Sequence, residues 1–288
     1  MSILTELEQY IENSPNQYSS FIRPSKGQLE ENFMNRKEPV GGSYTEVKFF
    51  KKYLHLFFQV LIYGLKIFNT KEFKIYRNLF KQLNRQIDEG VIRHIFTLKI
   101  LNDYQLIKNK ICVIGDGQLN FVGGLLKINN KNLKIYSINL VEMLIHDYLS
   151  IKEKKLLEDK YIKVVNKKED LEDNNAKLFL IDASKSELLK SEGINLFVNI
   201  ASMQEMTLSF VSKYFDIIKS NKSHFYCCNR KYKKLPGGEE LIFYEYPWGD
   251  GTFIFNEKCK WHERYYESKF PYIKKHYGEH LHALIKYK

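Results

Sequence analysis

Two glycines that flank an aspartate, Gly115, Asp116 and Gly117, form the most recognisable candidate binding motif of the chain. They follow a short apolar run, which suits a strand buried on both faces, and glycines after such a strand allow a tight turn and close approach of the backbone to a ligand. Backbone amides at the start of the next helix would then cradle an anionic or zwitterionic group. The third glycine of the dinucleotide fingerprint is absent, because Leu119 and Asn120 occupy that part of the loop, so an ordinary strand and turn is the alternative.

A histidine and a glutamate are the candidate catalytic groups. His262 carries an imidazole that titrates near neutral pH and can accept the proton of a hydroxyl, although a surface histidine beside Trp261 is the alternative. Glu205 ends a run of small and amide residues and can act as a base or a metal ligand. A glutamate in a first helical turn is also favoured by the helix dipole, and nothing in the spacing demands a metal.

Four further side chains suit the binding of a polar substrate. Gln204 lies in the amide-rich run beside Glu205, and Arg230 follows an apolar segment. Trp248 and Tyr265 offer rings on which the apolar face of a sugar can stack while its hydroxyls meet charged groups. We therefore predict a carbohydrate-binding surface formed by these residues.

The second half of the chain has the pattern of a mostly parallel α/β sheet. Short apolar runs alternate with helical segments after residue 108, which is typical of β-α-β units. Strands are predicted at 111–115, 133–139, 161–165, 177–181, 194–200 and 224–228, followed by hairpin-like strands at 241–246, 251–255 and 280–287. Helices are predicted at 121–128, 141–157 and 206–219. The last strands would form an antiparallel edge.

In open sheets of this kind, ligands bind beyond the carboxyl ends of the strands, where the strand order reverses. Asn139 ends the second predicted strand, at the position where an acid usually accepts hydrogen bonds from a ribose. Asp182 follows the fourth predicted strand and could bind the amino group of a nucleobase. The alternative is that it caps a helix that begins at Ser184. Asn199 lies near the end of the fifth. These residues and the glycine loop form the predicted cofactor site.

Residues 1–108 are predicted to form a helical N-terminal region, and residues 109–288 the α/β domain. Apolar residues recur at helical spacing between 45 and 104, which indicates packed helices and not a cofactor box. Before them, Pro15, Pro24, Pro39 and the pair Gly41 and Gly42 interrupt the chain, which is typical of an arm or lid.

Composition narrows the class of protein. The formal net charge of +11 permits nucleic acid, an anionic membrane surface or an anionic substrate, but the lysines are spread along the chain without an arginine-rich run, so no nucleic-acid partner is predicted. The four cysteines have neither zinc-type nor extracellular spacing, which favours reduced thiols and a cytoplasmic location. Polar residues interrupt the one membrane-like stretch, 53–68, so no integral membrane segment is expected. The sequence leaves open whether the protein forms a homo-oligomer.

The carboxyl-terminal motifs resemble those of the sugar O-methyltransferase family, in the same order. They are the run 199–206, the segment 225–230, Leu235-Pro236, Tyr246-Pro247-Trp248, and Cys259-x-Trp-His262 with Tyr265-Tyr266. The resemblance covers residues 110–288 well and the helical front part loosely. It implies a Rossmann-like class I methyltransferase fold that uses S-adenosylmethionine.

By position, the resemblance implies that Gly115, Asp116 and Gly117 meet the methionine part of the cofactor, Asn139 the ribose and Asp182 the adenine side. The expected activity is methyl transfer to a sugar hydroxyl, with His262 as the base. Two alternatives stay open: a weak or inactive methyltransferase-like protein that serves glycan assembly by binding, and a different nucleotide-dependent enzyme, since Asn139 would tolerate a phosphorylated ribose better than an acid would.

Overall fold

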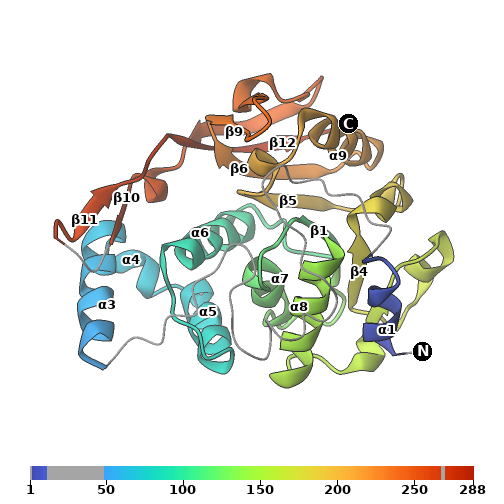
Figure 1. Cartoon of the computed structure of the whole chain (residues 1–288), viewed down its shortest axis with the longest axis horizontal. Coiled ribbons are helices and arrows are strands. Elements are labelled where there is room, and N and C mark those ends of the chain that lie inside the picture. Colours follow the sequence, from blue (N-terminus) through green and yellow to red (C-terminus); the bar gives the residue numbers. More distant parts are fainter. Residues whose placement is uncertain (1, 12–48, 267–269) are drawn as a thin grey trace.

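An eight-stranded sheet forms the centre of the molecule (Figure 1). The computed structural model describes residues 2–11, 49–266 and 270–288. Across the sheet the strand order is β3-β4-β2-β1-β5-β6-β12-β9. In chain order these strands are β1 (Lys110–Ile114), β2 (Lys134–Asn139), β3 (Ile162–Val164), β4 (Leu178–Asp182), β5 (Leu196–Ile200), β6 (His224–Arg230), β9 (Thr252–Lys258) and β12 (His280–Lys286).

The sheet confirms the predicted α/β, Rossmann-like class. All neighbouring pairs from β3 to β6 are parallel, and β12 is antiparallel to both β6 and β9. The antiparallel strand therefore lies one position inside the edge. One strand prediction was wrong: instead of a strand over 241–246, the chain forms a short hairpin of β7 (Tyr232–Lys234) and β8 (Glu240–Ile242), and a turn follows at Phe243–Glu245.

Helices cover both faces of the sheet because its strands are apolar on both sides (Figure 1). Ile111 and Val113 of β1 face a core that includes residues of α5 (Lys71–Gln82), α6 (Glu89–Asp103), α7 (Asn120–Leu126) and α8 (Val141–Glu153). Cys112 and Ile114 face the opposite core, which includes α9 (Leu208–Ser220). The alternation along β1 thus fixes a three-layer structure.

The helical N-terminal region shares the core of the sheet. Buried residues of α5 and α6 belong to the same apolar cluster as β1, and Leu7 of α1 (Ile3–Glu8) is buried in it as well. The change of pattern near residue 108 therefore does not coincide with a break in the core. The arm or lid expected before residue 45 lies mostly outside the described residues.

Two further elements lie beside the sheet and build the site. Helix α3 (Phe49–Tyr63), continued by the short α4 (Leu65–Phe68), contacts a ribbon formed by β10 (Arg264–Tyr266) and β11 (Ile273–Lys275). The ring of Phe58 stacks on that of Tyr266 at 5.0 Å. In the ranges that the structure describes, no helix combines the length and apolarity that a membrane span would need.

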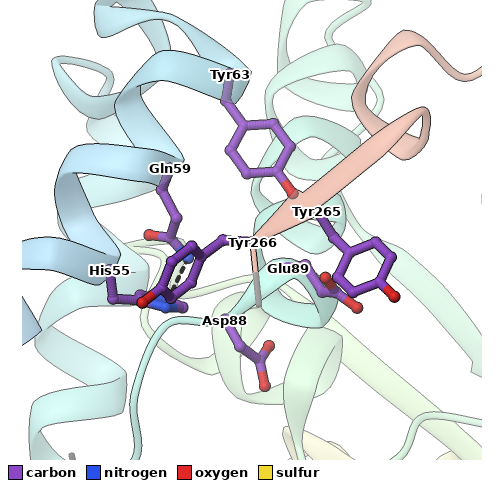
Figure 2. A pocket seen from close by; sticks show the side chains of 7 residues that line it. All are labelled: His55, Gln59, Tyr63, Asp88, Glu89, Tyr265 and Tyr266. Carbon is purple, nitrogen blue, oxygen red and sulfur yellow. Dashed lines mark hydrogen bonds between the residues drawn. The ribbon is translucent and has the colours of Figure 1, made fainter. Parts of the chain in front are cut away.

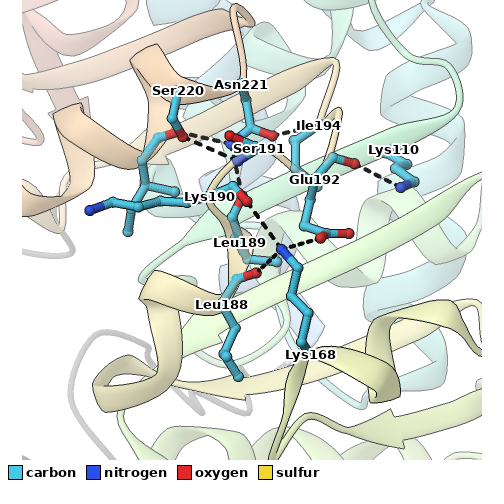
Figure 3. A network of polar contacts seen from close by, with 11 residues as sticks. Lys110, Lys168, Leu188, Leu189, Lys190, Ser191, Glu192, Ile194, Ser220 and Asn221 are labelled. Carbon is cyan, nitrogen blue, oxygen red and sulfur yellow. Dashed lines mark hydrogen bonds and ion pairs between the residues drawn. The ribbon is translucent and has the colours of Figure 1, made fainter.

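The start of β5 is tied to its neighbours by a polar network (Figure 3). Lys168 forms an ion pair with Glu192 and donates hydrogen bonds to the carbonyls of Leu188 and Lys190. The Lys110 ammonium at the start of β1 donates to the Glu192 carbonyl at 2.8 Å. These contacts hold the connection that precedes β5 against β1, and they leave the opposite ends of the strands to the site.

A close contact between α5 and α7 gives a test of the packing. A Cβ atom at Gly124 would lie 2.6 Å from the Tyr76 hydroxyl oxygen, which is buried without a hydrogen-bond partner among the described residues. We expect Gly124→Ala to lower the free energy of unfolding by ~1–3 kcal/mol through overpacking. Tyr76→Phe alone should be neutral or stabilising, because it removes an unpaired buried hydroxyl, and it should recover part of the loss in the double variant.

Urea denaturation of the four proteins measures these differences. Gly237→Ala is the control, because a Cβ atom there would meet nothing within 4 Å. A Gly124→Ala protein as stable as the control would show that α5 and α7 are not packed as described.

Candidate functional site

The carboxyl ends of neighbouring strands bring the predicted cofactor residues into one row. Asn139 at the end of β2 lies opposite Asp182 at the end of β4, and Ile114 of β1 lies opposite Asn199 of β5. The chain passes from β1 to β2 on one side and returns on the other side with β5, so the strand order reverses between β1 and β5. Ligands of doubly wound sheets bind at this switch point.

The glycine loop after β1 takes a left-handed course. Gly115 has φ +69°, which glycine adopts without steric cost, whereas Gln118 and Leu119 both have φ +57°. Leu119 is also buried and precedes α7 at the N-cap position. Leu119 therefore combines a glycine-like backbone with a leucine side chain, at a cost on the order of 1 kcal/mol, and the third glycine position of the fingerprint is Asn120, the first residue of α7.

Asp116 caps α7 with its side chain. Its carboxylate accepts hydrogen bonds from the backbone N–H groups of Phe121, at 3.0 Å, and Val122, at 2.7 Å. Burial raises the pKa of Asp116 to about 7, and the Asp147 carboxylate adds to this shift while the two amides oppose it. The predicted cofactor ligand thus has a structural role in which its charge is disfavoured.

Arg85 fixes the loop from the side of the helices. Its guanidinium donates to the Gln118 carbonyl at 2.7 Å and to the Asn120 side-chain oxygen at 3.0 Å. The Arg85 charge also acts against the rise of the Asp116 pKa. The residue lies just after α5, so the helical region helps to position the predicted cofactor loop.

The side chains of Asn139 and Asp182 bond within the protein. The Asn139 amide donates to the Asp116 carbonyl at 2.5 Å and accepts from the Leu140 N–H at 3.0 Å. The Asp182 carboxylate accepts from the N–H and the hydroxyl of Ser184, at 3.0 and 2.6 Å. Asp182 therefore caps the helical turn that follows it, which was the alternative to a contact with the cofactor.

Asn199 is the centre of a buried amide network that joins three strand ends. Its side-chain N–H₂ donates to the Ile114 carbonyl at 3.0 Å and to the Ser202 hydroxyl, and its oxygen accepts from the Asn229 amide at 2.8 Å. The Asn229 oxygen in turn accepts from the Gln204 N–H at 3.1 Å. The network holds the run 199–204 against the ends of β1 and β6.

Gln204 and Arg230, two predicted substrate residues, are brought together by this network. The Gln204 side-chain oxygen accepts from the Arg230 N–H at 2.8 Å. Glu205 instead forms an ion pair with Lys233 of the hairpin, at 3.2 Å. No described contact joins Glu205 to His262, so the structure does not pair these two candidate catalytic groups.

Trp248 lies away from this site. Its indole N–H donates to the Phe243 carbonyl, and its ring packs at 5.1 Å from that of Phe215. The Trp248 carbonyl accepts from the Tyr287 hydroxyl, and the Tyr287 N–H reaches Ser223, just before the start of β6. Arg230 is at the other end of that strand, ~20 Å away. The structure thus assigns Trp248 to a core contact and does not bring it to the predicted sugar-binding residues.

His262 belongs to a cluster of three histidines at the carboxyl edge. Its ring stacks on that of His280 at 3.8 Å and meets that of His276 edge-on at 4.3 Å. Burial, the other two histidines, Arg93 and Arg230 all lower the pKa of His262, so its imidazole is neutral. His276 and His280 were not predicted as site residues. The available signal was that His280 begins a predicted strand and that His276 lies four residues before it.

The cluster lines a pocket of about 360 Å³, which we call the histidine pocket. His280 lies opposite Arg230 in the register of β12 and β6, which places the pocket at the same edge of the sheet as the cofactor row. From β1 to β12 there are three strand spacings, or ~14 Å. Besides the histidines, its walls include the charged side chains of Lys258, Glu263, Arg264, Lys275 and Glu279.

A second pocket, of about 220 Å³, adjoins the first (Figure 2). This tyrosine pocket is formed by α3, the start of α6 and the ribbon, and it is lined by His55, Gln59, Tyr63, Asp88, Glu89, Tyr265 and Tyr266. The rings of Tyr265 and His276 lie 4.8 Å apart, so the two pockets meet there. Of the lining residues, the sequence predicted only Tyr265; the polar interruptions His55 and Gln59 in an apolar stretch were the signal for α3.

No family model and no curated protein matches the chain. Solved structures with a similar fold include the methyltransferase domain of bacterial CtHen1, a SAM-dependent methyltransferase from Aquifex aeolicus and a SAM-dependent O-methyltransferase from Thermotoga maritima. Their identities to this chain are 10%, 11% and 10%, with TM-scores of 0.43, 0.38 and 0.41. The alignments cover 69%, 75% and 68% of this chain and 99%, 100% and 65% of the others. Similarity this weak supports no conclusion about function.

Proposed function

We propose that the protein transfers a methyl group from S-adenosylmethionine to a hydroxyl of a carbohydrate. The observation that carries the proposal is the row of strand ends at the switch point of a doubly wound sheet, with the histidine pocket ~14 Å from it along the same edge and the tyrosine pocket next to that one. Such a point is where these sheets bind nucleotide-like ligands. Of the motifs that resemble sugar O-methyltransferases, the run 199–206, Asn229 with Arg230, and the segment 259–266 lie at this same edge, whereas Trp248 does not.

The residues of the row fit the cofactor through their backbone more than through their side chains. The side chains of Asp116, Asn139 and Asn199 hold the protein together, whereas Gly115 and Gly117 are only half-buried and leave the backbone that a bound amino acid and ribose would approach. Gly115 and Gly117 would hold the methionine part, and Asp182 would lie toward the adenine. When bound, the cofactor supplies an electrophilic methyl group.

The acceptor would lie in the tyrosine pocket. Tyr63, Tyr265 and Tyr266 offer ring faces, and Asp88 and Glu89 offer carboxylates to sugar hydroxyls (Figure 2). The imidazole of His262 would take the hydroxyl proton as the oxygen attacks, and a negative charge bound beside it would be needed to raise its lowered pKa for this role. Gln204 keeps the Arg230 backbone in place beside the histidine pocket. In this scheme Glu205 holds the hairpin of β7 and β8 through its ion pair with Lys233. It does not accept the hydroxyl proton of the acceptor.

Calorimetric titration with S-adenosylmethionine and S-adenosylhomocysteine tests the proposal, and no heat at millimolar ligand would refute it.

Gly115→Ala should lower the affinity for S-adenosylmethionine at least tenfold, because it strains the loop next to the ligand. Gly193→Ala is the matched control: its φ of +67° imposes the same strain, but a Cβ atom there meets nothing within 4 Å and the residue lies before β5.

His262→Ala should lower methyl transfer by ~10²-fold or more while the cofactor affinity is unchanged, as expected for the loss of a general base. Transfer of labelled methyl groups to a panel of free and phosphorylated sugars gives the rate, and calorimetry gives the affinity. His224→Ala, at the amino end of β6, is the control and should transfer at the wild-type rate. An equal loss of cofactor binding in His262→Ala would contradict the assigned role.

One observation favours a second function, a binding protein without turnover. The polar side chains of the cofactor row are engaged in internal hydrogen bonds, which would suit a fold that has kept its framework and lost its ligand contacts. Cofactor binding without transfer to any member of the sugar panel would favour this second function.

A further inference from the structure

Unpartnered imidazole nitrogens line the histidine pocket. Both ring nitrogens of His262, Nε2 of His276 and Nδ1 of His280 are buried without a hydrogen-bond partner among the described residues. A buried polar group without a partner costs ~1–3 kcal/mol. Three such rings side by side therefore indicate that a polar ligand completes their hydrogen bonds.

Two arginines add positive charge near these rings, and Glu89 lies 4.0 Å from Nε2 of His276. The charges of Arg93 and Arg230 act with burial to lower the pKa of His276 to about 4 and that of His280 to about 3. Arg93 belongs to α6 and Arg230 to the end of β6, so positive charge approaches the cluster from two elements. These two guanidinium groups would attract a negatively charged ligand.

The ribbon adds a second, independent observation. Arg264 of β10 and Lys275 of β11 lie directly opposite each other, and both line the pocket. Like charges at opposed positions of an antiparallel pair are destabilising. Neither side chain has an ion-pair partner among the described residues, whereas Glu263 and Glu279 are paired with Lys258, and Glu279 also with Lys231.

We propose that the histidine pocket binds the phosphoryl group of the acceptor, which is then a phosphorylated sugar. The proposal rests on the proposed function for the identity of the acceptor, and on the pocket alone for the anion. A phosphoryl group presents several acceptor oxygens and two charges, which matches the opposed arginine and lysine and the one N–H that the neutral imidazoles of His262 and His276 can each donate. The sugar ring would extend past Tyr265 into the tyrosine pocket, because the two pockets meet there.

Binding of inorganic phosphate, glucose 1-phosphate and glucose, by calorimetry in a phosphate-free buffer with EDTA, tests the proposal. Wild-type protein should bind glucose 1-phosphate at least tenfold more tightly than either inorganic phosphate or glucose. The double variant Arg264→Gln, Lys275→Gln should lose at least tenfold in affinity for both phosphates. The same variant should have an unchanged or higher melting temperature without ligand, because a repulsive pair is removed.

Lys131→Gln is the matched control, since Lys131 is exposed in the turn before β2, at the other edge of the sheet. It should bind as the wild type does. His276→Gln should also lower the affinity for inorganic phosphate and for glucose 1-phosphate at least tenfold. This second variant separates the role of the imidazoles from that of the ribbon.

Three results would overturn the proposal: equal affinity for inorganic and sugar phosphate, phosphate binding that requires a metal and disappears in EDTA, or phosphate binding that survives in the double variant. S-adenosylmethionine binding in a protein that binds neither phosphate would leave the proposed function standing and remove the phosphoryl site. Binding of glucose 1-phosphate without any binding of S-adenosylmethionine would do the reverse.

Discussion

Replacement of Asn199 by aspartate should destabilise the protein by ~3 kcal/mol or more at pH 8, and by less at pH 5. The Asn199 side chain is fully buried and donates to the Ile114 carbonyl. An aspartate keeps the shape but places a carboxylate oxygen against that carbonyl, so the buried charge faces a carbonyl oxygen on one side and keeps only the donors to its other oxygen, such as the Asn229 amide. At pH 5 the carboxyl group can be protonated and donate again, so part of the stability should return.

Urea denaturation at both pH values, each compared with the wild type at the same pH, measures the effect. Asn132→Asp is the control for the chemical change alone, because Asn132 is exposed in the turn before β2. We expect that control to stay within ~0.5 kcal/mol of the wild type. An Asn199→Asp protein whose loss is the same at pH 5 and pH 8 would show that the Ile114 contact does not decide the stability.

A large effect of pH on stability is expected from Asp116. Its pKa is raised to about 7 in the folded protein, so the group binds its proton more tightly there than in the unfolded chain. Its contribution to stability is therefore fully present below pH ~3.8 and is lost as the pH rises through 7. Between pH 5 and pH 8 the loss should be roughly 2.5 kcal/mol, at 1.36 kcal/mol per pKa unit.

Asp116→Asn removes the titration and should flatten this part of the pH profile by about that amount. The measurement is the free energy of unfolding in urea at half-unit steps from pH 5 to pH 8. Asp216→Asn, at an exposed position of α9, should leave the wild-type slope unchanged. A slope that is identical in Asp116→Asn and the wild type would mean that Asp116 stays ionised in the folded protein.

The sheet could be predicted from the sequence because its strands carry a local signal. The apolar runs 111–115 and 194–200 match the observed strands β1 and β5, with ends that differ by at most two residues. Burial on both faces of the sheet favours apolar side chains along the whole strand. The failure at 241–246 has the same origin. Leu241 and Phe243 are buried in the same apolar cluster as residues of α9, but a turn at Phe243 to Glu245 follows only three strand residues, and apolar composition does not distinguish a strand from such a turn.

The site was harder to predict because it depends on contacts between distant segments. The spacing of Asn139 and Asp182 identified strand ends, but not that both side chains would bond to neighbouring backbone or hydroxyl groups. Trp248 seemed suited to a sugar by its residue type, whereas its position near the start of β6 is set by Tyr287, 39 residues later. His276 and His280 join His262 only through the ribbon and the register of β12.

The ribbon of β10 and β11 has a mechanical consequence. It is paired with no other strand of the described sheet, and two strands alone are only marginally stable in water. Tyr266 stacks on Phe58 of α3, while Tyr265, one residue earlier, separates the two pockets. A shift of α3 would therefore carry Tyr265 with it and change the width of both pockets together, so under the proposed function α3, and not the sheet, would set the size of the acceptor.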